Sequence, residues 1–187
     1  MRRSHLSLLL AALAVTASAG CGGGATDTAA PEAAPASAPA PSAAAVQMSG
    51  QDRTWLRRIH AGGMAELQVA RLAQSNAKSR KVKSLGETLL TERGRFDEEL
   101  LRSAARFGVT LPSTLSKAHR KQAEELAGAA GRKFDRRFVA EMLKSHKNAI
   151  AVTRREITRG SAPEVVALAK TALPSLRSHL GMLRKAD

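Results

Sequence analysis

The stretch that decides the fold is DRTWLRRIHAGGMAELQVARLAQSN, residues 52–76. Its apolar and small side chains, with one glutamate among them, recur at steps of three and four residues: Trp55, Ile59, Gly63, Glu66, Ala70 and Ala73. This spacing places them along one face of an α-helix. The stretch therefore predicts an amphipathic helix with Asp52 as its N-cap, ending near Asn76 and Ala77.

Further segments follow the same helical rule. A second helix is expected over about 82–108, and a shorter one over about 116–129. A long helix ends at Arg159, and a last helix has Pro163 in its first turn, where the missing N–H of proline costs nothing. Pro174 lies inside this last helix, where its ring predicts a kink.

These segments predict an all-α fold. No segment alternates convincingly at period two, and aromatic residues make up only 3% of the chain, which argues against a β-sandwich. Four long helices with a short one in the middle favour a ferritin-like four-helix bundle, in which two helical hairpins are joined by a short crossover helix. Residues 52–187 are long enough to bury one core and are predicted to form a single domain.

The first 51 residues are of a different kind. Residues 1–20 contain two arginines and then an apolar run, which is typical of a signal peptide and too short for a mature membrane span. The small residues before Cys21 resemble a lipobox and predict lipidation of Cys21; cleavage after Ala19, which would release a soluble protein, is the alternative. Residues 21–51, rich in Ala, Pro and Gly, predict a disordered tether. We therefore expect an exported protein that an N-terminal lipid anchors to a membrane of the bacterial cell envelope.

Several passages of the predicted domain carry a resemblance to a known family. They are residues 61–67 (AGGMAEL), 108–112 (GVTLP), 134–138 (FDRRF) followed by His146, and Leu173-Pro174 followed by His179-Leu180. In this order they resemble the bacterial exported family called domain of unknown function 4142. The resemblance implies a ferritin-like bundle, usually secreted or lipid-anchored, with no established activity. The family often reads Asp-His where this chain has Glu92-Arg93, and Asp where it has Ser145, so the resemblance does not carry a metal site over to this chain.

Polar residues interrupt the apolar stripe of each long helix. They are Glu66, Arg93, His146 and His179, one per helix and at similar depths in the expected bundle. Burying them separately would cost several kcal/mol each, so we expect them to form one core cluster. The favoured interpretation is structural: a buried Glu66–Arg93 ion pair and two hydrogen-bonded histidines set the register of the helices.

Metal binding is the alternative for this cluster. Glu66, His146 and His179 have the donor atoms that suit a single zinc or iron ion, whereas a di-iron site needs Glu-x-x-His motifs that the chain lacks. Three methionines also lie one helical turn from a histidine, in the pairs His60–Met64, Met142–His146 and His179–Met182, a pattern that would suit Cu(I). Methionine at helical spacing is, however, ordinary core filler, and the default expectation is that no cofactor is present.

The remaining signals concern enzyme motifs and charge. No phosphate-binding Gly-rich loop and no nucleophile elbow occur, so no enzymatic activity is expected. Lys and Arg number 30 against 16 Asp and Glu, a formal charge of +14, which attracts polyanions. The predicted basic surface contains Arg80, Lys81, Lys83, Lys117, Arg120, Lys121, Arg132, Lys133, Arg136 and Arg137.

These observations favour a binding function over catalysis. The leading hypothesis is a non-enzymatic interaction module at an anionic envelope surface, with anionic lipid, a cell-wall polymer or an unidentified protein as partner. Nucleic acid is not expected, because the protein is predicted to be exported and is poor in aromatic residues. The alternative hypothesis is an envelope protein that binds a divalent metal ion or copper.

Overall fold

The computed structural model describes residues 48–186. Within them the chain forms five α-helices and no β-strand: α1 (Gly50–Asn76), α2 (Arg80–Arg106), α3 (Lys117–Ala127), α4 (Gly131–Arg159) and α5 (Pro163–Ala186). The predicted signal peptide, Cys21 and most of the predicted tether lie outside the described residues. Among the helices of 48–186, none combines the length and the apolar character that a membrane span requires.

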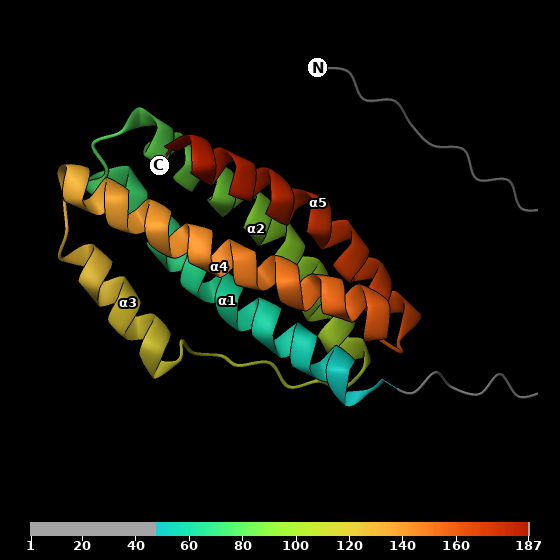
Figure 1. Cartoon of the computed structure of the whole chain (residues 1–187). Helices are drawn as coiled ribbons and strands as arrows, with labels where there is room; N and C mark the ends of the chain where they lie inside the picture. The colour runs from blue at the N-terminus through green and yellow to red at the C-terminus, as the bar shows by residue number, and fades with distance from the viewer. Residues whose placement is uncertain (1–47, 187) are drawn as a thin grey trace, which may run out of the picture. The chain divides into compact units, whose positions relative to one another are not determined.

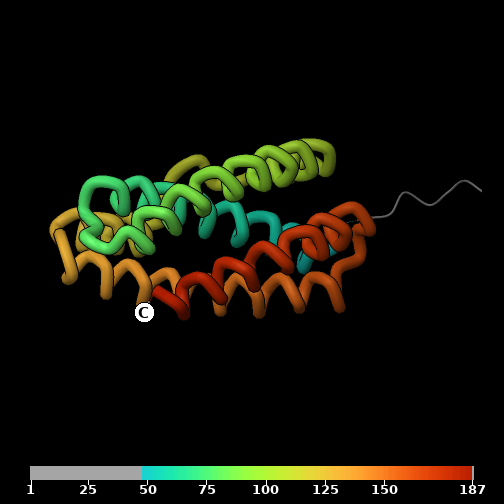
Figure 2. The backbone as a smooth tube through the Cα atoms, turned by 90° about the horizontal axis from the view of Figure 1, so that it is seen from above, coloured from blue at the N-terminus to red at the C-terminus, as the bar shows by residue number. Residues whose placement is uncertain are grey.

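The long helices form the predicted bundle of two hairpins (Figure 1). α1 packs along α2 and α4 along α5, while α1 also packs on α4 and α2 on α5. The segment after α2 runs back along α1 into α3, which packs on α1 and α4 and leads to the start of α4 (Figure 1; Figure 2). This connection is the crossover expected of a ferritin-like bundle, so the predicted all-α fold class is confirmed.

The start of α1 differs from the prediction. Ser49, not Asp52, is the N-cap, and the helix begins at Gly50, inside the predicted tether. The Ser49 hydroxyl accepts from the Asp52 N–H at 3.2 Å, and the Asp52 carboxylate accepts from the Ser49 N–H at 2.7 Å. This is a capping box, in which an acidic side chain three residues after the cap satisfies the cap's own N–H. Asp52 therefore occupies the third helical position, and Met48, just before the cap, is buried in the core.

The other helix ends follow the sequence closely. Gly108 follows α2 with φ +62°, a left-handed conformation that favours glycine, and the next residue, Val109, donates its N–H to the Ala104 carbonyl at 2.8 Å. Pro163 is the first residue of α5, as expected. Pro174 lies inside α5, which continues on both sides of it.

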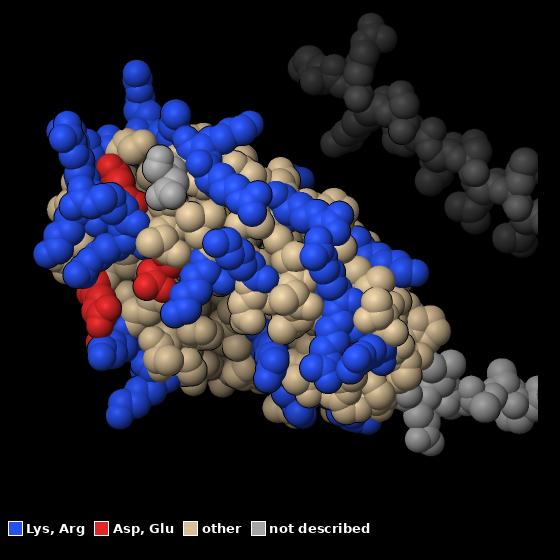
Figure 3. Space-filling view, in the orientation of Figure 1, with Lys and Arg blue, Asp and Glu red and all other residues tan. Residues whose placement is uncertain are grey.

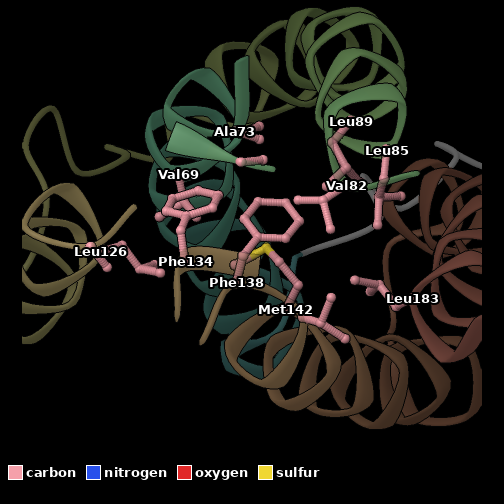
Figure 4. Packing of buried hydrophobic residues seen from close by; sticks show 14 of the residues in the cluster. Val69, Ala73, Val82, Leu85, Leu89, Leu126, Phe134, Phe138, Met142 and Leu183 are labelled. Atoms are coloured by element: carbon pink, nitrogen blue, oxygen red, sulfur yellow. The ribbon is translucent and has the colours of Figure 1, made fainter. Parts of the chain in front are cut away.

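The core is divided along its length. One hydrophobic cluster fills the end where α3 packs, around Phe134, Phe138 and Leu183 (Figure 4). A second cluster fills the end near Trp55, Leu100 and Val165. The four polar residues that interrupt the apolar stripes fall between the members of these clusters in the sequence of each long helix. The middle of the bundle therefore contains these buried polar residues, next to a smaller apolar cluster of Ile150, Ala172 and Leu176.

Candidate functional site

Three of the predicted site residues lie together in the middle of the bundle. Glu66 of α1, His146 of α4 and His179 of α5 each offer one donor atom, and these atoms all lie within 4.8 Å of one another. All three residues are buried, with exposed fractions of 6%, 1% and 4%. The helical stripes bring them together because each residue occupies a core-facing position of its own helix.

His146 is held in one tautomer. Its Nδ1 lies 2.9 Å from the Met142 carbonyl oxygen in the preceding turn of α4. A carbonyl oxygen can only accept, so Nδ1 carries the hydrogen, and Nε2 of the neutral ring is a bare lone pair. Burial lowers the pKa of His146 from its ordinary value of 6.5, against the opposing charge of Glu66. The ring is therefore neutral at neutral pH, which is the form that binds metals.

His179 is held in the opposite tautomer by Glu92, a residue that sequence analysis did not assign to the site. The Glu92 carboxylate lies 2.9 Å from His179 Nε2 and is 47% exposed. The carboxylate accepts the Nε2 hydrogen, so Nδ1 is the lone-pair atom of the neutral ring. Glu92 precedes the core-facing Arg93 but lies on the neighbouring face of α2. The spacing of the apolar residues therefore did not predict that Glu92 would contact the cluster.

The acceptor atoms of this group face one another. His146 Nε2 lies 3.4 Å from His179 Nδ1 and 3.7 Å from Glu66 Oε1. In the form with both rings neutral, two nitrogen lone pairs and a carboxylate oxygen point into one small volume; with a proton on His179 Nδ1, that nitrogen donates to His146 Nε2. Within residues 48–186, Glu66 makes no hydrogen bond to offset this repulsion. A cation or an added proton would stabilise the arrangement.

Arg93 corrects the favoured interpretation of the cluster. No ion pair within 4.0 Å joins it to Glu66 or to any other acidic residue of the described chain. Its guanidinium donates instead to the Ile59 carbonyl and lies 5.2 Å from the centre of the Phe96 ring. The reason is Gly63, where a side chain would overlap the guanidinium; without one, Arg93 reaches the backbone of α1.

A cavity of about 110 Å³ adjoins the cluster. Its inner wall contains Glu66, Arg93 and His179, and its outer wall contains exposed residues of α2 and α5, among them Glu99 and Ser175. The cluster is therefore reached from the surface between α2 and α5, although its own side chains are buried.

The methionine–histidine pairs are placed differently from the cluster. Both ring nitrogens of His60 contact acceptors, Asp97 Oδ1 at 2.8 Å and the Pro112 carbonyl at 3.1 Å, so neither is left for a metal beside Met64. The Met142 side chain packs in the hydrophobic cluster beside Phe138 (Figure 4). Met182 packs partly buried against that same cluster.

The predicted basic residues gather at one end of the bundle. They belong to the first turn of α2, to the first two turns of α4 and to α3, and all are exposed except the half-buried Lys83. Blue side chains crowd this end in the space-filling view (left in Figure 3) and also extend over the visible α4–α5 face. The start of α1 lies at the opposite end (Figure 1).

Comparison with known proteins places this bundle in a family. The fold and the cluster define a crossover four-helix protein with a buried group of potential metal ligands. Residues 37–186 match the family described as Domain of unknown function (DUF4142), and the chain belongs to this family, as the resemblance predicted. A search among curated proteins found no match.

Solved structures share the fold at low sequence identity. A DUF305 fragment from Deinococcus radiodurans has a TM-score of 0.66 at 17% identity, covering 74% of this chain and 96% of that one. CopM in its Cu(I)-bound form has a TM-score of 0.61 at 18% identity, covering 72% and 93%. A DUF305 protein from Streptomyces coelicolor has a TM-score of 0.61 at 10% identity, covering 71% and 88%. At these identities the similarity establishes the fold alone.

Proposed function

We propose that this protein binds a single transition-metal ion through Glu66 Oε1, His146 Nε2 and His179 Nδ1. The observation that carries the proposal is the pair of imidazole nitrogens that face each other 3.4 Å apart. In each ring the other nitrogen contacts a fixed acceptor, which leaves the facing nitrogen as the atom able to bind a metal ion. Metal-binding histidines are characteristically oriented by such acceptors, a carboxylate or a backbone carbonyl.

The spacing fits a tetrahedral ion. Two nitrogens at the usual distance from zinc, about 2.0–2.1 Å, lie about 3.3–3.4 Å apart when the geometry is tetrahedral. Glu66 Oε1 lies slightly farther out, at 3.7 Å from His146 Nε2, and a small rotation of its side chain would bring it to the ion. Two imidazoles and one carboxylate suit Zn(II), Cu(II) or Fe(II). CopM, which has a similar fold, was solved with Cu(I), Cu(II) and silver bound. Copper should therefore be among the metals tested.

The test is the metal content of the full chain, purified without a histidine tag and exposed separately to Zn(II), Cu(II) and Fe(II). We expect about one equivalent of at least one metal after dialysis, with His146→Ala and His179→Ala each removing it. His119→Ala is the matched control, because His119 lies on α3, away from the cluster. Failure to retain any metal, or full retention by His179→Ala, would contradict the proposal.

The gathered basic residues support a second candidate function, binding to an anionic surface of the cell envelope. Cations from three separate segments share one end of the bundle, which concentrates the positive potential there. Export and lipidation at Cys21 are part of this proposal, which includes no catalytic step. Vesicles containing phosphatidylglycerol should retain the protein at low salt and release it at high salt, and Arg136→Glu with Arg137→Glu should weaken retention. Retention that is insensitive to salt would contradict it.

A further inference from the structure

Arg93 carries a buried charge, and no carboxylate of residues 48–186 forms an ion pair with it within 4.0 Å. The residue is only 7% exposed, and its hydrogen bond to the Ile59 carbonyl uses one guanidinium nitrogen. Its Nε is buried and has no hydrogen-bond partner within residues 48–186. An uncompensated buried charge is strongly destabilising, so such a group usually has a counter-ion.

The cavity beside Arg93 also adjoins the proposed metal ligands. Arg93, Glu66 and His179 share its inner wall, and its volume is about 110 Å³. One water molecule takes about 30 Å³ in the liquid, so the cavity has room for roughly three or four heavy atoms in addition to hydrogens. Three protein ligands would leave a tetrahedral ion one further coordination position.

The charges of the cluster leave room for one negative charge. Glu66 and Arg93 cancel each other, and both histidines are neutral in the proposed complex. A divalent ion adds two positive charges, of which Glu92 offsets one through its hydrogen bond to His179. One positive charge remains at the buried inner wall of the cavity, and the exposed Glu99 of the outer wall offsets it only weakly because water screens that carboxylate.

We propose that this cavity binds a small monoanion of the carboxylate or bicarbonate class, held between the Arg93 guanidinium and the metal ion. The planar guanidinium matches the two oxygens of such an anion. The exposed Glu99 on the outer wall disfavours larger or more highly charged anions, such as phosphate esters. This inference rests on the proposed metal site. It predicts that the metal ion and the anion bind cooperatively, because each increases the affinity for the other.

Gly63 positions Arg93 for this role. A methyl group at Gly63 would overlap the guanidinium, whereas a methyl group at the neighbouring Gly62 would meet nothing within 4 Å. Gly63→Ala should therefore displace Arg93 from the cavity wall, and Gly62→Ala is a control with the same chemical change one residue away.

The experiment compares metal affinity of the full chain, by competition with a chromophoric chelator, in perchlorate buffer with and without excess sodium formate. The metal is whichever ion the protein retains. Formate should strengthen metal binding at least about tenfold, and isotope-labelled formate should show a shifted carboxylate vibration only when metal and protein are both present. Arg93→Gln should abolish the formate effect, while Arg95→Gln, an exposed arginine on the same helix, should keep it.

The outcomes separate the two proposals. If metal binds equally well with and without formate, the anion site is overturned and the metal site stands. If no metal binds under either condition, both are overturned. If Arg93→Gln does not fold, as judged by circular dichroism, the pair Gly63→Ala and Gly62→Ala decides the question. An equal formate effect in these two variants would overturn the role of Arg93.

Discussion

Two buried polar groups of this bundle are built in opposite ways. At the start of α1, the Asp52 carboxylate accepts from Ser49 and from the backbone N–H groups of Ser161, at 3.0 Å, and Ala162, at 3.3 Å. In the middle of the bundle, Glu66 and two imidazole nitrogens face one another without donors. We call the first group the N-terminal junction; it comprises Ser49, Asp52, Glu156 and Ser161.

The ionisation of the two groups follows from this difference. Burial opposes ionisation of Asp52, but interactions with Glu156, Ser49 and Ser161 outweigh it and hold the pKa of Asp52 well below its usual range. Burial and the neighbouring Asp52 raise the pKa of Glu156 to about 7. At the junction, the protein's own donors therefore satisfy the Asp52 carboxylate, whereas the mid-bundle cluster presents acceptors to a ligand. The comparison separates a polar group that stabilises the fold from one that is available for binding.

The largest expected effect is on the junction. Asp52→Ala removes an acceptor that the start of α1 shares with the turn between α4 and α5, including the acceptor of the buried Ala162 N–H, and should cost about 3–5 kcal/mol of unfolding free energy. Urea denaturation measures this. Asp135→Ala is a comparison with a smaller expected effect, about 1 kcal/mol, because the Asp135 carboxylate accepts from the N–H groups of the exposed Lys78 and the half-buried Ser79. Folded Asp52→Ala should retain as much metal as the wild type. Loss of metal from this variant would show that the junction and the mid-bundle cluster do not act independently.

The next effect is a pH dependence that originates in the junction. The folded-state pKa of Glu156, about 7, lies above its ordinary value of 4.5, so its contribution to stability is complete below pH 4.5 and is lost as pH rises through about 7. The loss should approach about 3 kcal/mol on going from about pH 5 to about pH 8. His146 acts in the opposite direction, because its lowered pKa reduces stability as pH falls below 6.5.

Comparison of the wild type with Glu156→Gln isolates the Glu156 part of this profile. Urea unfolding across the same pH range should show the decline in the wild type and a much smaller one in the variant, since the amide cannot ionise. If the unfolding free energies of the wild type and the variant fall in parallel with pH, Glu156 does not titrate in this range. The proposed difference in ionisation between the junction and the mid-bundle cluster would then be wrong.

The smallest effect tests the support of the mid-bundle cluster. Glu92→Gln removes the charge that orients and polarises His179 and should weaken metal binding about 10–100-fold, as is typical for such a supporting partner. Stability should change little, because the carboxylate is half exposed. Glu98→Gln, on an exposed face of the same helix, should bind metal as the wild type does. A wild-type affinity in Glu92→Gln would remove Glu92 from the site.

Much of the fold could be predicted from local patterns. The period of the apolar residues locates all five helices, and Gly108 and Pro163 mark ends that the structure places at or next to those positions. The polar residues on the apolar stripes also predicted that Glu66, His146 and His179 would meet. The N-cap of α1 was missed because Ser49 follows a compositionally biased segment, and its pairing with Asp52 is recognisable only as a capping box.

The sequence by itself therefore determined the helices, their buried faces and the identity of the polar residues that face the core, because these depend on spacing along one chain. Only the tertiary structure decided the partners of those residues. Whether Arg93 reaches Glu66 or the Ile59 carbonyl depends on the contact that Gly63 allows between α1 and α2. The tautomer of His179 depends on Glu92, 87 residues away. Such partners depend on how the helices are rotated and shifted against one another, which the packing of the whole core sets.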